Sequence, residues 1–198
     1  MTIYDRKSKE SGKLTYTISN VTTTGNTTSA NFISQMVDEK GKILSEGAGK
    51  FKCNAGVLYI DAKVAIPQES MAAYKDMDVK ADEVFIDYPA TPAVGQRLNN
   101  VSYKMEMYNK GSLFSTITLA QSNRKIESKE TVTSGMGSWE CYKITYDSQF
   151  KATIGGIGIP INMKVTEWFA PGFGVVKSEI YNKNGKFLGA TQITSIGK

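Results

Sequence analysis

The segment TEWFAPGFGVVKSE at residues 166–179 contains the clearest signal for the fold. One strand is expected to enter a turn within this segment, and a second strand is expected to leave it. Pro171 has no N–H to donate to a neighbouring strand, and Gly172 and Gly174 can adopt the positive φ angles of a tight corner. Large aromatic side chains surround the turn, so we expect it to cover the end of a sheet; they are Trp168, Phe169 and Phe173.

The segments on both sides of this corner alternate between apolar and polar residues with the two-residue period of strands. Within residues 159–165 every second residue is apolar, and the alternation slips at Glu167 and Trp168, which predicts a β-bulge just before the corner. Residues 101–108 form the clearest half-buried strand. Tight turns separate ten or more such strands, which predicts an antiparallel sheet rather than alternating strands and helices.

One segment, Pro67–Met77, is predicted to form a short helix, because proline suits the first helical turn and apolar residues recur three positions apart. No low-complexity linker interrupts the chain, and 198 residues suit one large β domain, so we expect a single domain over residues 1–198. No apolar run reaches the roughly 18 residues that a membrane-spanning helix needs.

The composition restricts the chemistry that the protein can perform. The chain contains no histidine, which removes the commonest general base and the commonest metal ligand. The net charge is +5, but arginine occurs only at positions 6, 97 and 124, and the lysines are dispersed. Nucleic-acid binders usually carry arginine-containing basic stripes. We therefore expect no nucleic-acid partner, no metal, no cofactor and no catalytic residue.

The two cysteines, Cys53 and Cys141, lie far apart in strand-like segments. Two thiols without histidine cannot complete a structural zinc site on their own. Two interpretations stay open. The cysteines form a disulfide if the compartment is oxidising, or they are two free thiols that behave as small hydrophobic residues.

Two sequence features resemble functional motifs but are interpreted as structural. Gly155–Gly158 lacks the Lys-Ser/Thr pair of a phosphate loop and precedes no helix, so it is expected to be a hairpin tip. The acidic residues within 76–87 lack the pattern of a calcium loop and are expected to form a solvated face. A carboxylate-based hydrolase is the enzymatic alternative, although nothing in the sequence selects a pair of carboxylates.

Methionine and aromatic residues on the inner faces of the predicted strands either line an apolar ligand groove or fill the core. A filled core is the simpler interpretation from the sequence alone. The candidate groove residues are Tyr103, Met105, Met107, Tyr142, Tyr146, Met163 and Trp168.

Four segments of the chain resemble an uncharacterised family of exported proteins from Gram-negative bacteria, known as a domain of unknown function. The segments lie within residues 52–61, 88–98, 123–144 and 167–179, and the last is the most specific. In the third segment, SGMGSW at residues 134–139 departs from the Pro-Ala-Gly-Thr-Phe turn of the relatives.

This resemblance implies export to the periplasm, or an outer-membrane lipoprotein, with the leader or lipidated cysteine absent from this sequence. It also implies a mainly β fold with a curved antiparallel sheet, or incomplete (half) β-barrel, similar to that of lipoprotein carriers. The family brings no established activity and no catalytic residues.

Two classes of function follow from these observations. The first is an exported, non-enzymatic envelope protein that binds a lipid, an acyl chain or a lipoprotein anchor in the concave face of a half-barrel. Its partner would be a lipid or an acylated protein, and the protein would be peripheral to the membrane or lipid-anchored rather than spanning it. The second is a structural or protein-interaction module of the envelope with a filled core and no small-molecule ligand.

Overall fold

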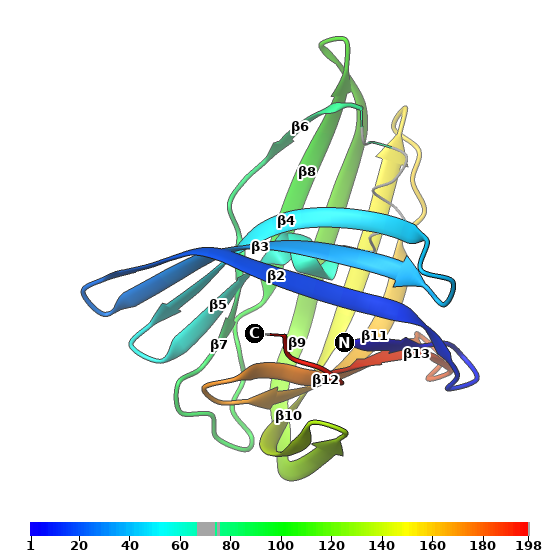
Figure 1. Ribbon diagram of the computed structural model, residues 1–198. Coiled ribbons are helices and arrows are strands. Elements are labelled where there is room, and N and C mark those ends of the chain that lie inside the picture. The colour runs from blue at the N-terminus through cyan, green and yellow to red at the C-terminus, as the bar shows by residue number, and fades with distance from the viewer. Residues whose placement is uncertain (67–73, 75, 198) are drawn as a thin grey trace.

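The computed structural model describes residues 1–66, 74 and 76–197. In this part of the chain, thirteen strands form one antiparallel sheet (Figure 1). The strands are β1 (Thr2–Tyr4), β2 (Glu10–Thr24), β3 (Thr27–Asp38), β4 (Ile43–Asn54), β5 (Val57–Asp61), β6 (Asp78–Ala81), β7 (Phe85–Tyr88), β8 (Val101–Asn109), β9 (Ser112–Ser134), β10 (Gly137–Ile154), β11 (Ile161–Ala170), β12 (Gly174–Asn182) and β13 (Phe187–Gln192).

The predicted mainly β fold with an open antiparallel sheet is confirmed. The strands follow the order β6-β8-β9-β10-β11-β12-β13-β1-β2-β3-β4-β5-β7, so β6 and β7 form the two edges of the described sheet. Only residues 82–84 connect these two edge strands in sequence. A connection of this length spans at most about 14 Å. The sheet therefore curls until its two edges approach each other, although no backbone ladder joins β6 to β7 among the described residues.

The helix predicted at Pro67–Met77 falls on residues outside the described part of the chain, apart from Tyr74, Asp76 and Met77. The described residues contain a single short 3-10 helix, η1 (Ala62–Ala65). Asp61 caps this helix, because its Oδ1 accepts a hydrogen bond from the backbone N–H of Lys63 at 3.0 Å. Across the residues that the structure covers, no helix has the length and apolarity to cross a bilayer.

The corner between β11 and β12 forms as the sequence predicts. Gly172 and Gly174 have φ angles of +76° and +121°, which only glycine adopts easily. The register of the β11–β12 pair shifts between Trp168 and Phe169, next to the predicted position, but the bulge lies in β12 after the corner and not in the strand before it. The extra residue is Val176 of β12, which has no partner in the register. The bulge is therefore expected to bend and twist β12 as it leaves the corner.

Two apolar clusters lie on opposite faces of the sheet. Trp168 belongs to the smaller cluster and Phe169 to the larger one, and consecutive strand residues point to opposite faces. We call the face with the larger cluster the inner face. Its fully buried members include Tyr103, Met107 and Ile144. The inner face is therefore the main hydrophobic core.

Side chains attach the edge strand β7 to the inner face of β9 and β11. Arg124 of β9 is buried and donates from Nη1 to Asp87 Oδ1 at 3.1 Å and from Nη2 to the Asp87 carbonyl at 2.9 Å. Tyr88 of β7 stacks on Phe169 with ring centroids 4.9 Å apart and donates to Glu167 Oε2 at 2.8 Å. The curl of the sheet is thus stabilised by side-chain contacts where backbone pairing is absent.

Both cysteines are free thiols in this structure, which corresponds to the second of the two interpretations that the sequence left open. Cys141 lies buried in the smaller cluster on β10, whereas Cys53 is half-buried on β4. These strands are not neighbours in the sheet order, and the register pairs Cys53 with Leu58 and Cys141 with Glu130. The alternative of two free thiols therefore holds for this structure.

Candidate ligand-binding groove

A groove runs past β3, β4 and η1 on one side and past the edge strand β6 on the other. Its first part is an apolar pocket of about 190 Å³. The apolar side chains that line it come from β3, β4, the η1 region, β6 and β8; they are Phe32, Ala48, Val64, Ile66, Val79 and Met105. Segments that are distant in sequence thus meet here because the sheet curls.

A polar pocket of about 480 Å³ adjoins the apolar pocket and shares Phe32, Ala48 and Lys63 with it. Charged side chains line this second part, and two of them lie in the connection between the sheet edges. The charged residues are Lys50, Asp61, Lys63, Asp82 and Glu83. We refer to the two pockets together as the groove.

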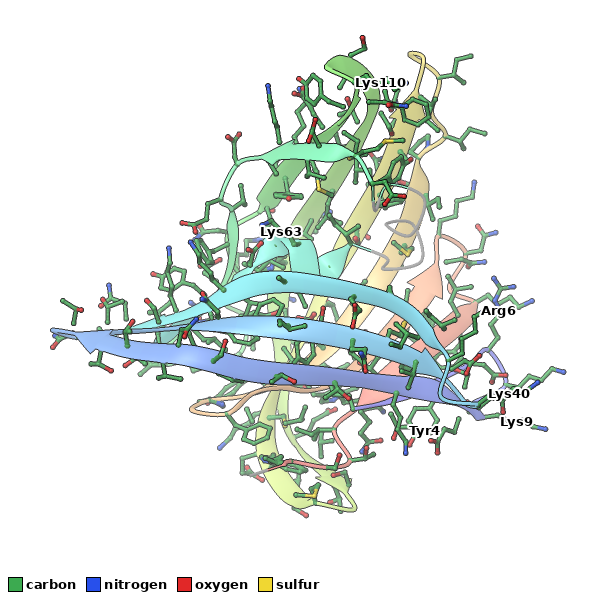
Figure 2. The ribbon with its side chains drawn as sticks, turned by 45° about the horizontal axis from the view of Figure 1, so that its top comes forward. Tyr4, Arg6, Lys9, Lys40, Lys63 and Lys110 are labelled. Atoms are coloured by element: carbon green, nitrogen blue, oxygen red, sulfur yellow. The ribbon has the colours of Figure 1, made fainter. Side chains whose placement is uncertain are left out.

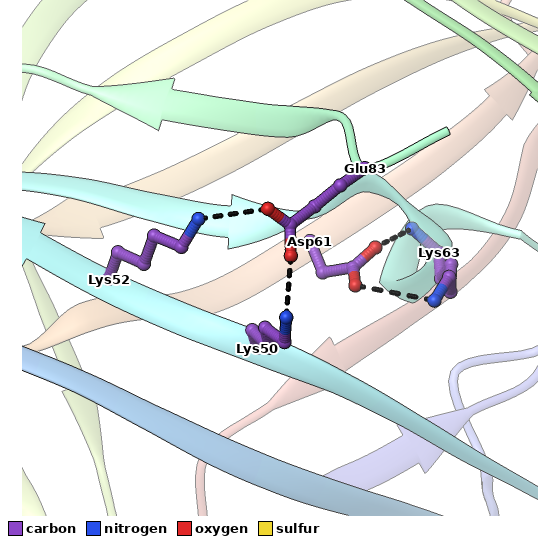
Figure 3. A network of polar contacts seen from close by, with 5 residues as sticks. All are labelled: Lys50, Lys52, Asp61, Lys63 and Glu83. Atoms are coloured by element: carbon purple, nitrogen blue, oxygen red, sulfur yellow. Dashed lines mark hydrogen bonds and ion pairs between the residues drawn. The ribbon is translucent and has the colours of Figure 1, made fainter. Parts of the chain in front are cut away.

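Ion pairs hold the charged side chains around the polar pocket (Figure 3). Glu83 accepts hydrogen bonds from Lys50 Nζ at 2.7 Å and from Lys52 Nζ at 3.0 Å. These two lysines lower the pKa of Glu83 from its ordinary value, and Glu83 raises the pKa of Lys50. Asp61 is buried, and its Oδ2 lies 3.7 Å from Nζ of Lys63. The rim of the groove therefore presents ammonium and carboxylate groups together, in nearly balanced numbers.

The position of Phe32 in the groove depends on a glycine of the neighbouring strand. Phe32 pairs with Gly49, and a Cβ atom at Gly49 would lie 2.5 Å from Cζ of the phenyl ring. Phe32 also contacts Phe51 and Tyr16, with ring centroids 4.5 Å and 5.5 Å away. Burial, and to a smaller degree the charge of Glu167, raises the pKa of Tyr16 to about 12. Phe32 is thus fixed in an apolar aromatic group that borders the groove.

The structure brings six of the seven sequence-predicted lining residues into one cluster. Tyr103, Met105, Met107 and Tyr146 are buried members of the inner-face core, and Tyr142 and Met163 pack against it. Met105 alone among the seven lines the groove described above. Trp168 lies in the smaller cluster on the other face, where its Nε1–H donates to Glu130.

A buried carboxylate with two tyrosine partners is a feature that sequence reasoning missed. Tyr88 and Tyr146 each donate their hydroxyl to the Glu167 carboxylate at 2.8 Å. Burial raises the pKa of Glu167 above its ordinary value, and the hydrogen bonds from Tyr146 and Tyr88 and the charge of Arg124 oppose this rise. The sequence did indicate that Glu167 points to the inner face, because it lies two residues from both Val165 and Phe169, which belong to that face.

The buried ionisable groups Glu167 and Cys141 pack within the two apolar clusters. Both oxygens of Glu167 accept from tyrosines that belong to the core. Burial raises the pKa of the Cys141 thiol to about 11, which disfavours the nucleophilic thiolate. Among the described residues, no three Cys, Asp or Glu side chains converge in a way that could hold a metal ion.

An open antiparallel sheet with facing edges and a groove beside one edge defines an incomplete β-barrel. The chain belongs to the DUF3108-like family, whose model matches residues 1–193. The resemblance to a family of uncharacterised domains, stated from the sequence, is thereby confirmed.

Two crystal structures share the fold of the whole chain. One is of a protein from Parabacteroides distasonis ATCC 8503 described as a "putative lipoprotein"; it is 22% identical with a TM-score of 0.76, over 96% of this chain and 89% of that one. The other is of a "putative exported protein with YmcC-like fold" from Bacteroides fragilis NCTC 9343; it is 21% identical with a TM-score of 0.76, over 100% of this chain and 93% of that one. Among curated proteins, none matches this chain.

Proposed function

We propose that this protein is an exported, non-enzymatic protein of the cell envelope that binds a lipid, an acyl chain or the acyl anchor of a lipoprotein in the groove. The observation that supports this most is the adjacency of the two pockets: an apolar pocket opens onto one lined by lysines and carboxylates. An amphiphile has the same division between an apolar chain and a polar head group. Ligand sites commonly combine an apolar lining with a few placed polar groups.

The arrangement of the rim indicates which end of such a ligand enters first. Met105 and Ile66 are nearly fully buried at the apolar pocket, so this end suits the acyl chain. Lys50 and Lys63 are solvent-accessible at the polar pocket and can donate to a carboxylate, phosphate or ester oxygen of the head group. The carboxylates of Asp61 and Glu83 hold these lysines in place, and a bound head group would compete for their ammonium groups.

The names of the two similar crystal structures support export and a place in the envelope. A protein at this place would be periplasmic or located at the outer membrane, and peripheral or lipid-anchored rather than membrane-spanning. Acyl chains and lipoproteins are abundant in that compartment, which fits the proposed ligand class.

A structural or protein-interaction module of the envelope is the second candidate function. The observation that favours it is the filled inner face, where Tyr103, Met107 and Tyr146 are buried in the core instead of lining an open cavity. In that case the groove would be a surface feature without a ligand.

Native mass spectrometry with organic extraction of protein purified from its own envelope tests the proposed function. Near-stoichiometric co-purifying lipid or fatty acid is the expected result, and it should be reduced in Ala48→Trp, because Ala48 lines both pockets. Ala120→Trp is the matched control, since Ala120 is an exposed strand residue of β9 that lines neither pocket. A clean ligand-free mass for the wild type would favour the interaction module instead.

A further inference from the structure

Two neighbouring hairpin tips expose large apolar side chains. The β8–β9 and β10–β11 tips project side by side at the top of the molecule (Figures 1 and 2), and the β9–β10 ladder pairs Ser115 with Ile154 close to both tips. The exposed residues, which we call the apolar tip, are Leu113, Phe114, Ile154, Ile157, Ile159 and Ile161.

The backbone of the second hairpin holds its isoleucines in solvent. Ile157 and Ile159 are 80% and 83% exposed. Ile154 and Ile157 exchange backbone hydrogen bonds of 2.9 Å and 3.0 Å across a two-glycine turn, so the turn is tight. Gly158 lies against β10, and a Cβ at this position would be 2.5 Å from the Ala152 carbonyl oxygen. The backbone at Gly158 therefore packs closely on β10, while the side chains of Ile157 and Ile159 on either side of it remain exposed.

The apolar tip differs from the scattered exposed residues of ordinary protein surfaces. Single exposed apolar side chains are normal, whereas contiguous exposed apolar groups indicate a protein or membrane contact. A standard protein interface needs about 20–30 residues on each side. Two narrow hairpin tips supply far fewer, whereas insertion into lipid stabilises each apolar side chain separately and needs no broad matching surface.

The charge of the two tips favours a lipid surface with anionic head groups. Residues 109–116 and 151–161 contain Lys110 and Lys151 and no acidic residue. Lys80 of the adjacent strand β6 lies 4.6 Å from the Tyr108 ring centroid and adds a third ammonium group. Two acidic residues lie beside Tyr108: Asp78 of β6 pairs with it, and Glu106 accepts a hydrogen bond from its hydroxyl and is paired with Lys104. Basic side chains beside protruding apolar residues are the usual combination for binding at a membrane interface.

We propose that the apolar tip inserts into the interfacial region of a lipid bilayer, with Lys110 and Lys151 contacting anionic head groups. This contact would place the protein on a membrane surface without a spanning segment. It is independent of the groove, because none of the six residues of the apolar tip lines either pocket.

Vesicle flotation of the full chain tests this proposal. The vesicles contain phosphatidylethanolamine and phosphatidylglycerol, and vesicles of phosphatidylcholine alone serve for comparison. The double variant Ile157→Asp with Ile159→Asp should lower partitioning to the mixed vesicles by about tenfold or more. Val94→Asp is the matched control, because Val94 is also exposed, at 60%, but lies in a loop outside the apolar tip. Lys110→Glu with Lys151→Glu should weaken binding to the mixed vesicles and not to phosphatidylcholine.

A direct readout uses tryptophan at the tip. Lipids brominated along the acyl chain should quench the tryptophan fluorescence of Ile157→Trp more than that of the wild type. The fluorescence of Val94→Trp should be quenched no more than that of the wild type. Both changes are at exposed positions, so thermal melting should confirm that the variants are folded. The proposal would be overturned if the wild type did not float with the vesicles, or if the double aspartate variant floated as well as the wild type. It would also be overturned if the wild type bound no lipid but formed a dimer that the double aspartate variant did not form.

Discussion

The variant Glu167→Ala tests whether side chains close the curled sheet. It would leave the hydroxyls of Tyr88 and Tyr146 buried without their acceptor, and each such unpaired group costs about 1–3 kcal/mol. We therefore expect the free energy of unfolding to fall by about 2–5 kcal/mol. Adding Tyr88→Phe and Tyr146→Phe removes the unpaired hydroxyls, so the triple variant should recover part of this loss.

The assay is guanidinium chloride unfolding followed by the fluorescence of Trp139 and Trp168. Glu167→Gln is the conservative control, because it keeps the side-chain length and one carbonyl acceptor, and it should lose about 1–2 kcal/mol. A loss below about 1 kcal/mol for Glu167→Ala, or no recovery in the triple variant, would refute the reasoning.

The same variants have a predicted pH dependence. Burial raises the pKa of Glu167 in the folded protein above the ordinary value of 4.5, so the folded state binds the Glu167 proton more tightly than the unfolded chain does. The stability that this proton contributes is full below the unfolded pKa and is lost as the pH rises through the folded pKa. Relative to Glu167→Gln, the wild type should therefore be most stable at acidic pH. A difference that does not change with pH would contradict the assigned direction.

Three further changes test other parts of the fold. Gly49→Ala should lower stability by about 1–3 kcal/mol in thermal or chemical unfolding, because its Cβ would meet the Phe32 ring, whereas Gly135→Ala has open space and should change little. Trp168→Ala should lower the free energy of unfolding by about 3–5 kcal/mol, because Trp168 is buried. Phe173→Ala should lower it clearly less, because the Phe173 side chain is 41% exposed. Equal losses would show that the corner is not packed as described. In the native protein, a thiol reagent should modify Cys53 before Cys141, whose pKa burial raises to about 11, and a disulfide found after unfolding under non-reducing conditions would contradict the free thiols.

Strand content and the corner could be predicted from sequence because both depend on local patterns. The period-two alternation at residues 101–108 reports one buried face directly, and Pro171 with Gly172 restricts the backbone at the turn. The inward positions of Tyr103, Met105 and Met107 followed from the same alternation. Their role did not follow, because alternation shows which face is buried and does not show whether that face meets a ligand or other side chains.

The groove could not be predicted because it depends on contacts between distant strands. Val79 and Phe32 become neighbours of one pocket only when the sheet curls and its edges approach. The same is true of Glu83 with Lys50 and Lys52, which are more than thirty residues away in sequence. Glu167 is a different case. Its inward phase was visible, but an acidic residue on an apolar face gave no indication of which tyrosines would pair with it.

The most direct test of the central claim is a binding titration with a naturally fluorescent polyene fatty acid on three purified proteins. A ligand site in the groove predicts saturable binding to the wild type and to Ala120→Trp. It predicts a loss of at least about tenfold in affinity for Ala48→Trp, because Ala48 lines both pockets. All three proteins should unfold at similar denaturant concentrations, since both positions are exposed. Equal binding by Ala48→Trp and wild type, or no binding by either, would contradict a ligand site in this groove.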